Sequence, residues 1–345
     1  MFVSLKWPGR WRQTSTPPLG KGGQAVVYEV LDSKDKKFAL KLLAPKKPKA
    51  AYARFKTEIA AIRKLNHPNI IKVVDSSDDP EFPYYVMEYV KGAVSLREAL
   101  DSGKNPYSMD PVKAVDFFIQ LSEVVKACEF VKVVHRDFSP GNVLLLPDGT
   151  IKVIDFGVCQ IEGGETVTLT DESVGTHNYM APECESGAED KVDSRADLYS
   201  AGKLLWTAIT GQKAFSRETP VFNSKSLRLM LPDCMNAWHL NHLFERTIRH
   251  DVSNRFKNAE DALVLGKHVK RVISNRFPPL EFLAELGCPS CGFGKVDGFP
   301  GNTLLFNLPE YMNKFVALRC NVCGYCFVLD IDTANKSLEK RKGLS

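Results

Sequence analysis

Hydrophobic and polar residues alternate along the first part of the chain, a pattern typical of β-strands. The alternation runs through residues 19–43 around a cluster of glycines, and it returns at 70–74 and 84–90. Between these segments, apolar residues recur every three or four positions over 50–65, which predicts an amphipathic helix ended by a His-Pro-Asn turn. We therefore expect an antiparallel sheet accompanied by one helix.

Beyond Gly92 the hydrophobic period becomes helical, most clearly over 112–130, 196–210 and 240–249. A small sheet lobe should therefore precede a larger helical lobe, which is an α+β arrangement. Two consecutive prolines near residue 278 and a later run of cysteines indicate a boundary. The predicted division is a main domain over 12–275, a linker over 276–285, a cysteine-rich domain over 286–335 and a basic tail over 336–345.

Composition narrows the class of protein only slightly. Hydrophobic residues make up 44% and charged residues 25% of the 345 residues, which is ordinary for a soluble globular protein. The net charge of +5 is mild and scattered, so nucleic acid is not indicated as a partner. No apolar run approaches the length of a membrane helix, and the first ten residues lack the apolar region of a secretory signal. We therefore expect a cytoplasmic protein without a membrane anchor.

A glycine-rich segment lies between two strand-like arms. It consists of Gly20, Lys21, Gly22, Gly23, Gln24, Ala25, Val26 and Val27. Glycines let a backbone close over phosphates, but the same residues also fit a simple hairpin turn. Two charged residues follow it along the chain. Lys41 lies in the next predicted strand, and Glu58 lies on the helix after that strand.

Three further motifs continue this order. They are His135-Arg136-Asp137-Phe138-Ser139-Pro140-Gly141-Asn142, then Asp155-Phe156-Gly157, then Ala181-Pro182-Glu183. With these motifs the chain resembles a Hanks-type serine/threonine protein kinase, of the kind found in bacteria, over about residues 19–269. The resemblance implies a bilobal kinase fold and ATP-dependent phosphorylation of protein hydroxyls.

The resemblance also implies the catalytic roles. Asp137 would accept the proton of the substrate hydroxyl, and Lys41, held by Glu58, would contact the α- and β-phosphates. Asn142 and Asp155 would supply hard oxygen ligands to Mg²⁺ or Mn²⁺. ATP and a divalent cation are therefore the expected cofactors.

Other positions follow from the same resemblance. The adenine pocket would consist of Val27, Ala39, Leu144, Met87 and the backbone of Glu88 to Val90, below the glycine-rich segment. An internal hydrophobic column would be formed by Phe156, His135, Ile62 and Val73 above Asp197. Arg255 would pair with Glu183 as a structural contact.

Two residues depart from the family pattern. Ala25 stands where a third glycine is usual, and Ser139 stands where serine/threonine kinases usually carry a lysine near the γ-phosphate. The hydroxyls of Ser139 and Thr176 could hold Asp137 instead. Two alternatives therefore stay open: a pseudokinase scaffold that binds nucleotide with little turnover, and a small-molecule kinase. The long segment between Asp155 and Glu183 favours a protein substrate over a small one.

The same segment carries candidate regulatory residues. Arg136 directly precedes the catalytic aspartate, where related kinases bind a phosphate from the activation segment. Thr168 and Thr170 lie upstream of Thr176 at a spacing common in bacterial relatives, and we expect autophosphorylation there. Glu172 could instead pair with Arg136 without any phosphate.

The C-terminal cysteines form two CxxC pairs, each followed by glycine. Cys288, Cys291, Cys320 and Cys323 could converge on one structural Zn²⁺, as in a zinc ribbon, with residues 304–308 and 315–318 as its candidate strands. Redox pairs and disulfides are the competing interpretations, and Cys326 is left over. The ribbon could dock to a protein partner or to its own kinase lobe.

Overall fold

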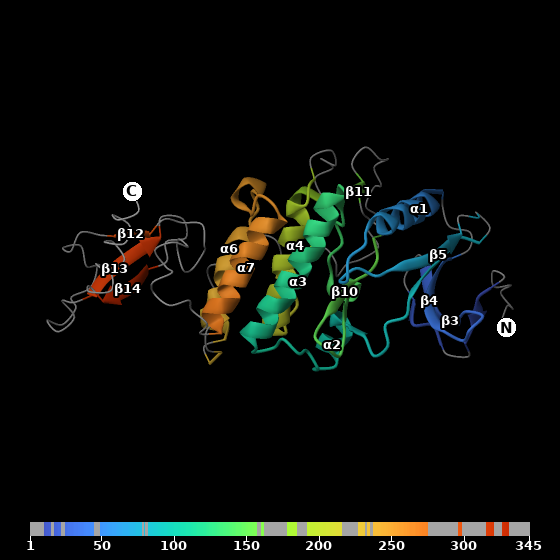
Figure 1. Cartoon of the computed structure of the whole chain (residues 1–345), viewed down its shortest axis with the longest axis horizontal. Coiled ribbons are helices and arrows are strands. Elements are labelled where there is room, and N and C mark those ends of the chain that lie inside the picture. Colours follow the sequence, from blue (N-terminus) through green and yellow to red (C-terminus); the bar gives the residue numbers. More distant parts are fainter. Residues whose placement is uncertain are drawn as a thin grey trace, which may run out of the picture.

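The computed structural model describes the chain in fifteen stretches. These are residues 10–14, 17–21, 25–44, 49–77, 79, 82–156, 160–161, 178–184, 192–215, 227–231, 233–234, 237–274, 296–298, 315–320 and 326–330. Up to residue 274 they form a β-rich small lobe, coloured blue in Figure 1, beside a helical large lobe coloured green to orange.

The small lobe is a twisted antiparallel sheet with one long helix. Its strands are β1 Arg12–Gln13, β2 Gly20–Lys21, β3 Ala25–Leu31, β4 Lys37–Leu43, β5 Val73–Ser77 and β6 Tyr84–Glu88, in the order β1-β3-β4-β6-β5 with β2 on β3. Helix α1 spans Lys49–Lys64. Alternation along β6 sends Tyr84 and Val86 into a cluster with Trp11, and sends Tyr85 and Met87 into the main core.

The strand predicted at 70–74 begins later than its apolar residues suggest. β5 starts at Val73, whereas Ile70 forms an isolated parallel bridge with Val153 and the Ile71 N–H donates to the Val153 carbonyl at 3.0 Å. Both isoleucines are buried because they cross to the large lobe rather than continue the sheet. Apolar residues alone could not distinguish these two uses.

The large lobe is built around one buried helix. Its helices are α2 Leu96–Asp101, α3 Pro111–Phe130, α4 Arg195–Thr210, α5 Leu227–Met230, α6 Asn241–Thr247 and α7 Ala259–Ile273. Figure 1 shows α3, α4, α6 and α7 lying side by side, and α4 is buried on nearly every face. Asp110 caps α3 with Pro111 at its first position, and Gly211 ends α4 at φ 69°.

The chain also forms several short strands between residues 94 and 161. They are β7 Val94–Ser95, β8 Val133–Val134, β9 Val143–Leu145, β10 Ile151–Val153 and β11 Gln160–Ile161; β7, β9 and β10 form one sheet, and β8 pairs with β11. The predicted helices at 112–130, 196–210 and 240–249 match α3, α4 and α6 to within a few residues. The α+β prediction with a sheet lobe and a helical lobe is thus confirmed.

Near the C-terminus, three strands form an antiparallel sheet of their own. β12 Val296–Gly298 pairs with β13 Phe315–Cys320, which pairs with β14 Cys326–Asp330. The strand expected at 315–318 is present, and Cys326 begins β14. The other strand, expected at 304–308, lies outside the described residues. Within the stretches of chain that the structure describes, no helix is long and apolar enough to cross a bilayer.

Candidate active site

The loop after β8 is fixed from below by the first turn of α4. The backbone N–H groups of His135 and Arg136 each donate to a carboxylate oxygen of Asp197, both at 2.8 Å. Arg136 adopts a left-handed conformation with φ 65°, which costs a non-glycine residue roughly 1–2 kcal/mol. The Asp197 carboxylate stabilises this strained backbone by holding the two amides around it.

Asp137 follows directly and is held by Asn142. The Asn142 amide, on the 3₁₀ helix Pro140–Asn142, donates to the Asp137 carbonyl at 3.0 Å and to its Oδ2 at 2.8 Å. The buried Oδ1 accepts no hydrogen bond from any described residue. Burial, reinforced by the negative charge of Asp155, raises the pKa of Asp137 to about 7. Such a carboxyl group is poised to accept a proton.

Opposite this loop, Lys41 of β4 reaches two carboxylates. Its Nζ lies 2.7 Å from Oε1 of Glu58 on α1 and 3.0 Å from Oδ1 of Asp155. Burial alone would lower the pKa of Lys41, but the charges of Asp155 and Glu58 raise it well above its ordinary value. The structure thus brings together the lysine, the helix glutamate and one of the predicted metal ligands.

The structure contains the part of the predicted hydrophobic column that lies next to Asp197. The His135 ring lies 4.3 Å from the Phe156 ring and 4.6 Å from the Phe138 ring, between centroids. Burial lowers the pKa of His135 to about 4, so the imidazole is neutral. Ile62 is fully buried and Val73 half-buried in the same core. Asp155 next to Phe156 is a second left-handed residue, with φ 63°.

The predicted adenine residues come from adjacent strands. Ala39 is opposite Met87 across β4 and β6, Val27 is opposite Lys41 across β3 and β4, and Leu144 is in β9. The Glu88 side chain, for which the sequence assigned only a backbone role, binds Lys152 at 2.8 Å. It therefore joins the small-lobe strand to β10 of the large lobe.

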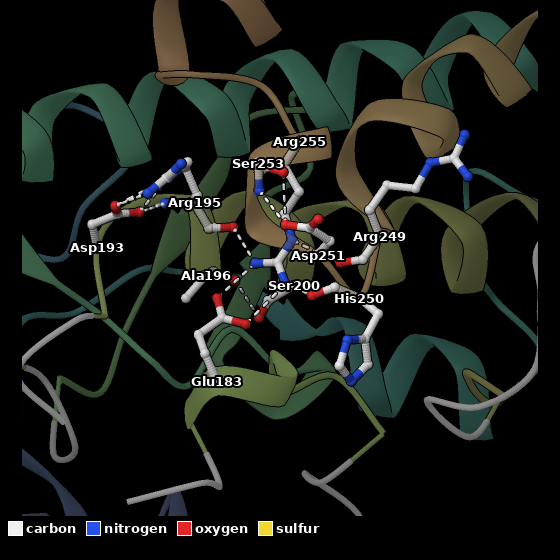
Figure 2. Close-up of polar contacts among 10 residues, drawn as sticks. All are labelled: Glu183, Asp193, Arg195, Ala196, Ser200, Arg249, His250, Asp251, Ser253 and Arg255. Atoms are coloured by element: carbon white, nitrogen blue, oxygen red, sulfur yellow. Dashed lines mark hydrogen bonds and ion pairs between the residues drawn. The ribbon is translucent and has the colours of Figure 1, made fainter. Parts of the chain in front are cut away.

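A second buried ion pair stabilises the large lobe (Figure 2). The Arg255 guanidinium binds both oxygens of Glu183, at 2.6 and 2.8 Å. Its remaining N–H groups donate to the carbonyls of Arg249, His250 and Arg195, and its Cζ lies 4.8 Å from the Tyr199 ring centroid. Glu183 belongs to the 3₁₀ helix Pro182–Cys184, so this pair anchors the end of the predicted activation segment.

Ser139 does not hold Asp137 in the way its hydroxyl allowed. Ser139 is buried, but no hydrogen bond joins its hydroxyl to Asp137 among the described contacts, whereas Asn142 makes two. The support expected from Ser139 together with Thr176 stays a prediction, because Thr176 lies outside the described residues. Several predicted residues lie outside the described ones: Gly22, Gly23, Gln24, Gly157, Thr168, Thr170, Glu172, Thr176, Cys288, Cys291 and Cys323.

Sequence reasoning missed one residue of the site. The Tyr85 hydroxyl donates to Oε1 of Glu58 at 2.7 Å, the same atom that Lys41 contacts. The signal was present, because Tyr85 lies two positions before Met87 and strand alternation puts both on one face. What the sequence lacked was the position of α1 above that face.

Comparison with known proteins agrees with this geometry. Residues 14–266 match the protein kinase domain family, and the chain belongs to that family. It is 37% identical over 59% of its length to a probable serine/threonine-protein kinase of Streptomyces coelicolor, and 31% identical over 73% to one of Clostridium acetobutylicum. It is 32% identical over 59% to serine/threonine-protein kinase PknB of Mycobacterium tuberculosis.

The match covers only part of each relative. The aligned region is 31%, 39% and 33% of those three proteins respectively, so the chain matches roughly a third of their length. All three names describe serine/threonine kinases, which agrees with the bacterial Hanks-type resemblance of the motifs. The relatives' regions outside the match carry no information about this chain.

Proposed function

We propose that this protein is an ATP-dependent protein kinase that phosphorylates serine and threonine hydroxyls of other proteins and of its own activation segment. One observation carries the proposal. Lys41, Glu58 and Asp155 form a connected charged cluster, and Asp137 is held nearby by Asn142 with one buried oxygen unused. A pseudokinase has no need to preserve a proton acceptor, metal ligands and a phosphate-binding lysine together.

The donor set fits a nucleotide and its metal. Asp155 and the side-chain oxygen of Asn142 are the hard ligands that Mg²⁺ prefers, and Lys41 carries a positive charge beside them. When bound, magnesium and ATP supply the transferable phosphoryl group and neutralise its charge. The chain's own task is to hold Lys41 against the phosphates and to keep the Asp137 carboxylate ready for the substrate proton.

Asp137 and Asn142 act as one unit. Asn142 donates to Oδ2, which leaves Oδ1 available to accept a proton and orients the carboxylate. The raised pKa of Asp137 makes it a stronger base than an ordinary aspartate. The hydroxyl of the substrate would lie within hydrogen-bond reach of that oxygen.

The direct test is phosphoryl transfer by the purified full chain. It is incubated with γ-labelled ATP, Mg²⁺ and casein as a generic acceptor, and the modified residues are mapped by mass spectrometry. We expect phosphoserine and phosphothreonine, with Asp137→Asn reducing the rate by about 10²–10⁴-fold. Full activity in a folded Asp137→Asn variant would contradict the role of the base. Nucleotide binding without transfer in the parent would favour a pseudokinase, and transfer to small alcohols alone would favour a small-molecule kinase.

The missing lysine at position 139 is a separate question. A cation there would stabilise charge that develops on the transferring group, so Ser139→Lys should raise the rate or leave it unchanged. A lower rate in a folded variant would indicate that the serine belongs to an adapted site.

Control by phosphorylation is proposed for Thr168 and Thr170. Arg136 is a buried cation that directly precedes Asp137, and in kinases that resemble this one such an arginine receives a phosphate from the activation segment. Replacing both threonines with alanine should lower the rate to that of the phosphatase-treated parent. Equal rates in all three preparations would exclude this pair and favour Glu172.

For the C-terminal domain we propose one structural zinc ion bound by Cys288, Cys291, Cys320 and Cys323. The support is the set of four cysteines in the sequence and the three-stranded sheet of this region, since a structural zinc ion supplies folding energy to a small unit. Metal analysis should find one zinc per chain, and Cys288→Ser should release it without loss of ATP binding. A ribbon of this kind could dock to a partner protein. A cytoplasmic location, where thiols stay reduced, agrees with this proposal.

A further inference from the structure

Three elements of the small lobe meet at one carboxylate oxygen. Oε1 of Glu58 lies 2.7 Å from Lys41 Nζ and accepts a hydrogen bond from the Tyr85 hydroxyl, also at 2.7 Å. Lys41 is in β4, Tyr85 is in β6 and Glu58 is in α1. The tyrosine therefore touches the ion pair that the proposed function depends on, without contributing a charge of its own.

The register of the sheet explains why Tyr85 can reach this point. Lys41 and Tyr85 are cross-strand partners of β4 and β6, so their side chains leave the same face of the sheet next to each other. Phe55, one turn before Glu58 on α1, packs against the Tyr85 ring with centroids 5.5 Å apart. Tyr85 is only 1% exposed, so its hydroxyl has no access to bulk water.

From this geometry we propose that Tyr85 is a positioning residue that holds α1, and with it Glu58, in the arrangement that keeps Lys41 ready for the phosphates. The inference rests on the proposed kinase function. A buried phenol hydroxyl is costly unless it has an acceptor, and Glu58 is the acceptor it has here. Any outward movement of α1 would remove that acceptor and leave the hydroxyl buried and unpaired.

The electrostatics of Glu58 agree with this role. Burial raises the pKa of Glu58 to about 7, and the charge of Lys41 and the hydrogen bonds from Lys41 and Tyr85 act in the opposite direction. Asp155, on the other side of Lys41, raises it further. The Tyr85 hydroxyl thus helps to keep the carboxylate ionised at the position where Lys41 needs it.

The test compares two hydroxyl deletions on neighbouring residues of β6. Tyr85→Phe keeps the ring and its contact with Phe55 and removes only the hydrogen bond. Tyr84→Phe makes the same chemical change on the opposite face of the sheet, where the hydroxyl interacts with Asp75. We expect Tyr85→Phe to lower kcat about tenfold while the KM for ATP changes less than about twofold, because fewer molecules hold α1 in place. Tyr84→Phe should leave both constants unchanged.

A double-mutant cycle separates positioning from packing. In a Glu58→Ala background the hydroxyl has lost its acceptor, so adding Tyr85→Phe should cause no further loss of kcat. Equal losses in both backgrounds would show that Tyr85 acts only through general stability and would overturn the proposal. No loss from Tyr85→Phe in the parent would overturn it as well.

Hydrogen exchange gives a measurement that does not require catalysis. In the full-length Tyr85→Phe variant, the amides of α1, Lys49–Lys64, should exchange about tenfold faster than in the parent and in Tyr84→Phe. If the parent transfers no phosphate but α1 responds in this way, the proposed function fails and the positioning role stands. If the parent is active and neither exchange nor kcat responds, the positioning role fails and the proposed function stands.

Discussion

Two buried ion pairs in the described part of the chain, Lys41 with Glu58 and Arg255 with Glu183, each join a cation to a glutamate, but they differ in how many N–H groups of the cation have acceptors. Every N–H of the Arg255 guanidinium is satisfied, by Glu183 and by the carbonyls of Arg249, His250 and Arg195. Lys41 binds Glu58 and Asp155 through single contacts, and an N–H of its ammonium remains for another acceptor within the described surroundings.

This difference separates a structural pair from a functional one. The saturated arginine has nothing left to offer a ligand, so its pairing serves only to join Glu183 to the segment before α7. The lysine is a point charge that can redistribute its contacts among carboxylates and phosphates. The following experiments test whether this division of roles is real, starting with the largest effect.

Arg255→Met should destabilise the folded protein by about 3–5 kcal/mol, because it leaves the Glu183 carboxylate without its partner in a mostly buried position. The measurement is urea unfolding of the full chain, with Arg271→Met, an exposed arginine of α7, as the matched control. The control should change stability by less than about 0.5 kcal/mol. Equal effects of the two variants would show that the Arg255 pair contributes little.

Lys41→Met should have the opposite profile. We expect kcat/KM for ATP to fall by about 10²–10³-fold, or about 2.7–4 kcal/mol in transition-state stabilisation, with a much smaller change in unfolding free energy. Lys37→Met is the matched control and should keep its activity, because Lys37 lies on the same face of β4 but is an exposed side chain bound to Glu29, away from Glu58 and Asp155. A Lys41→Met variant that retained its rate would show that the Lys41 pair is not functional and would contradict the proposed difference between the two pairs.

Arg255→Lys tests the geometry of the saturated pair while keeping its charge. A lysine cannot reproduce the planar fork or reach all the carbonyls, so stability should fall by about 1–3 kcal/mol. Below the unfolding temperature, the kinetic constants should equal those of the parent. A selective loss of kcat would mean that the Arg255 pair contributes to catalysis after all.

The pH dependence of the rate should come from the carboxyl groups around Lys41 and not from the Arg255 pair. Glu58 and Asp137 both have a pKa raised to about 7 and both must be ionised, so kcat/KM should be about a quarter of its maximum at pH 7 and fall by up to about a hundredfold per unit well below it. Stability should move the other way. The folded state binds more protons than the unfolded state between the ordinary carboxyl pKa and 7, so the unfolding free energy decreases as pH rises through that range.

This profile is measured by initial rates and urea unfolding at matched ionic strength. Arg255→Lys is the control for the rates and should keep the acid limb where the parent has it. A rate that stays flat from pH 5 to pH 7 would contradict the raised pKa values of the two carboxyl groups.

The sequence predicted most of the fold because its periodicities are strong. The helix at 50–65 and the buried helix at 196–210 were located to within a residue or two, since their apolar residues repeat regularly. The failure at 70–74 has a physical cause, because Ile70 and Ile71 are apolar for a contact with Val153 that lies far along the chain. Local pattern cannot reveal such a partner.

The site divides in the same way. Motif order named Lys41, Glu58, Asp137, Asn142 and Asp155, and the structure brings them into one region. It could not show that Asn142 uses its amide to hold Asp137, nor that Tyr85 reaches Glu58, because both depend on the direction of side chains from separate elements. The motifs in the sequence identify the catalytic residues, whereas the residues that hold them in place are found only from the structure.

Arg136 and Asp155 have one further consequence, for anyone who tries to make this protein more heat-resistant. Both adopt positive φ angles, a conformation that glycine tolerates and most other residues resist. A selection for thermal survival alone would therefore favour glycine at these two positions. Such a selection would remove the guanidinium proposed for control by phosphorylation and the carboxylate proposed to bind the metal, so each round of screening must also select for phosphoryl transfer.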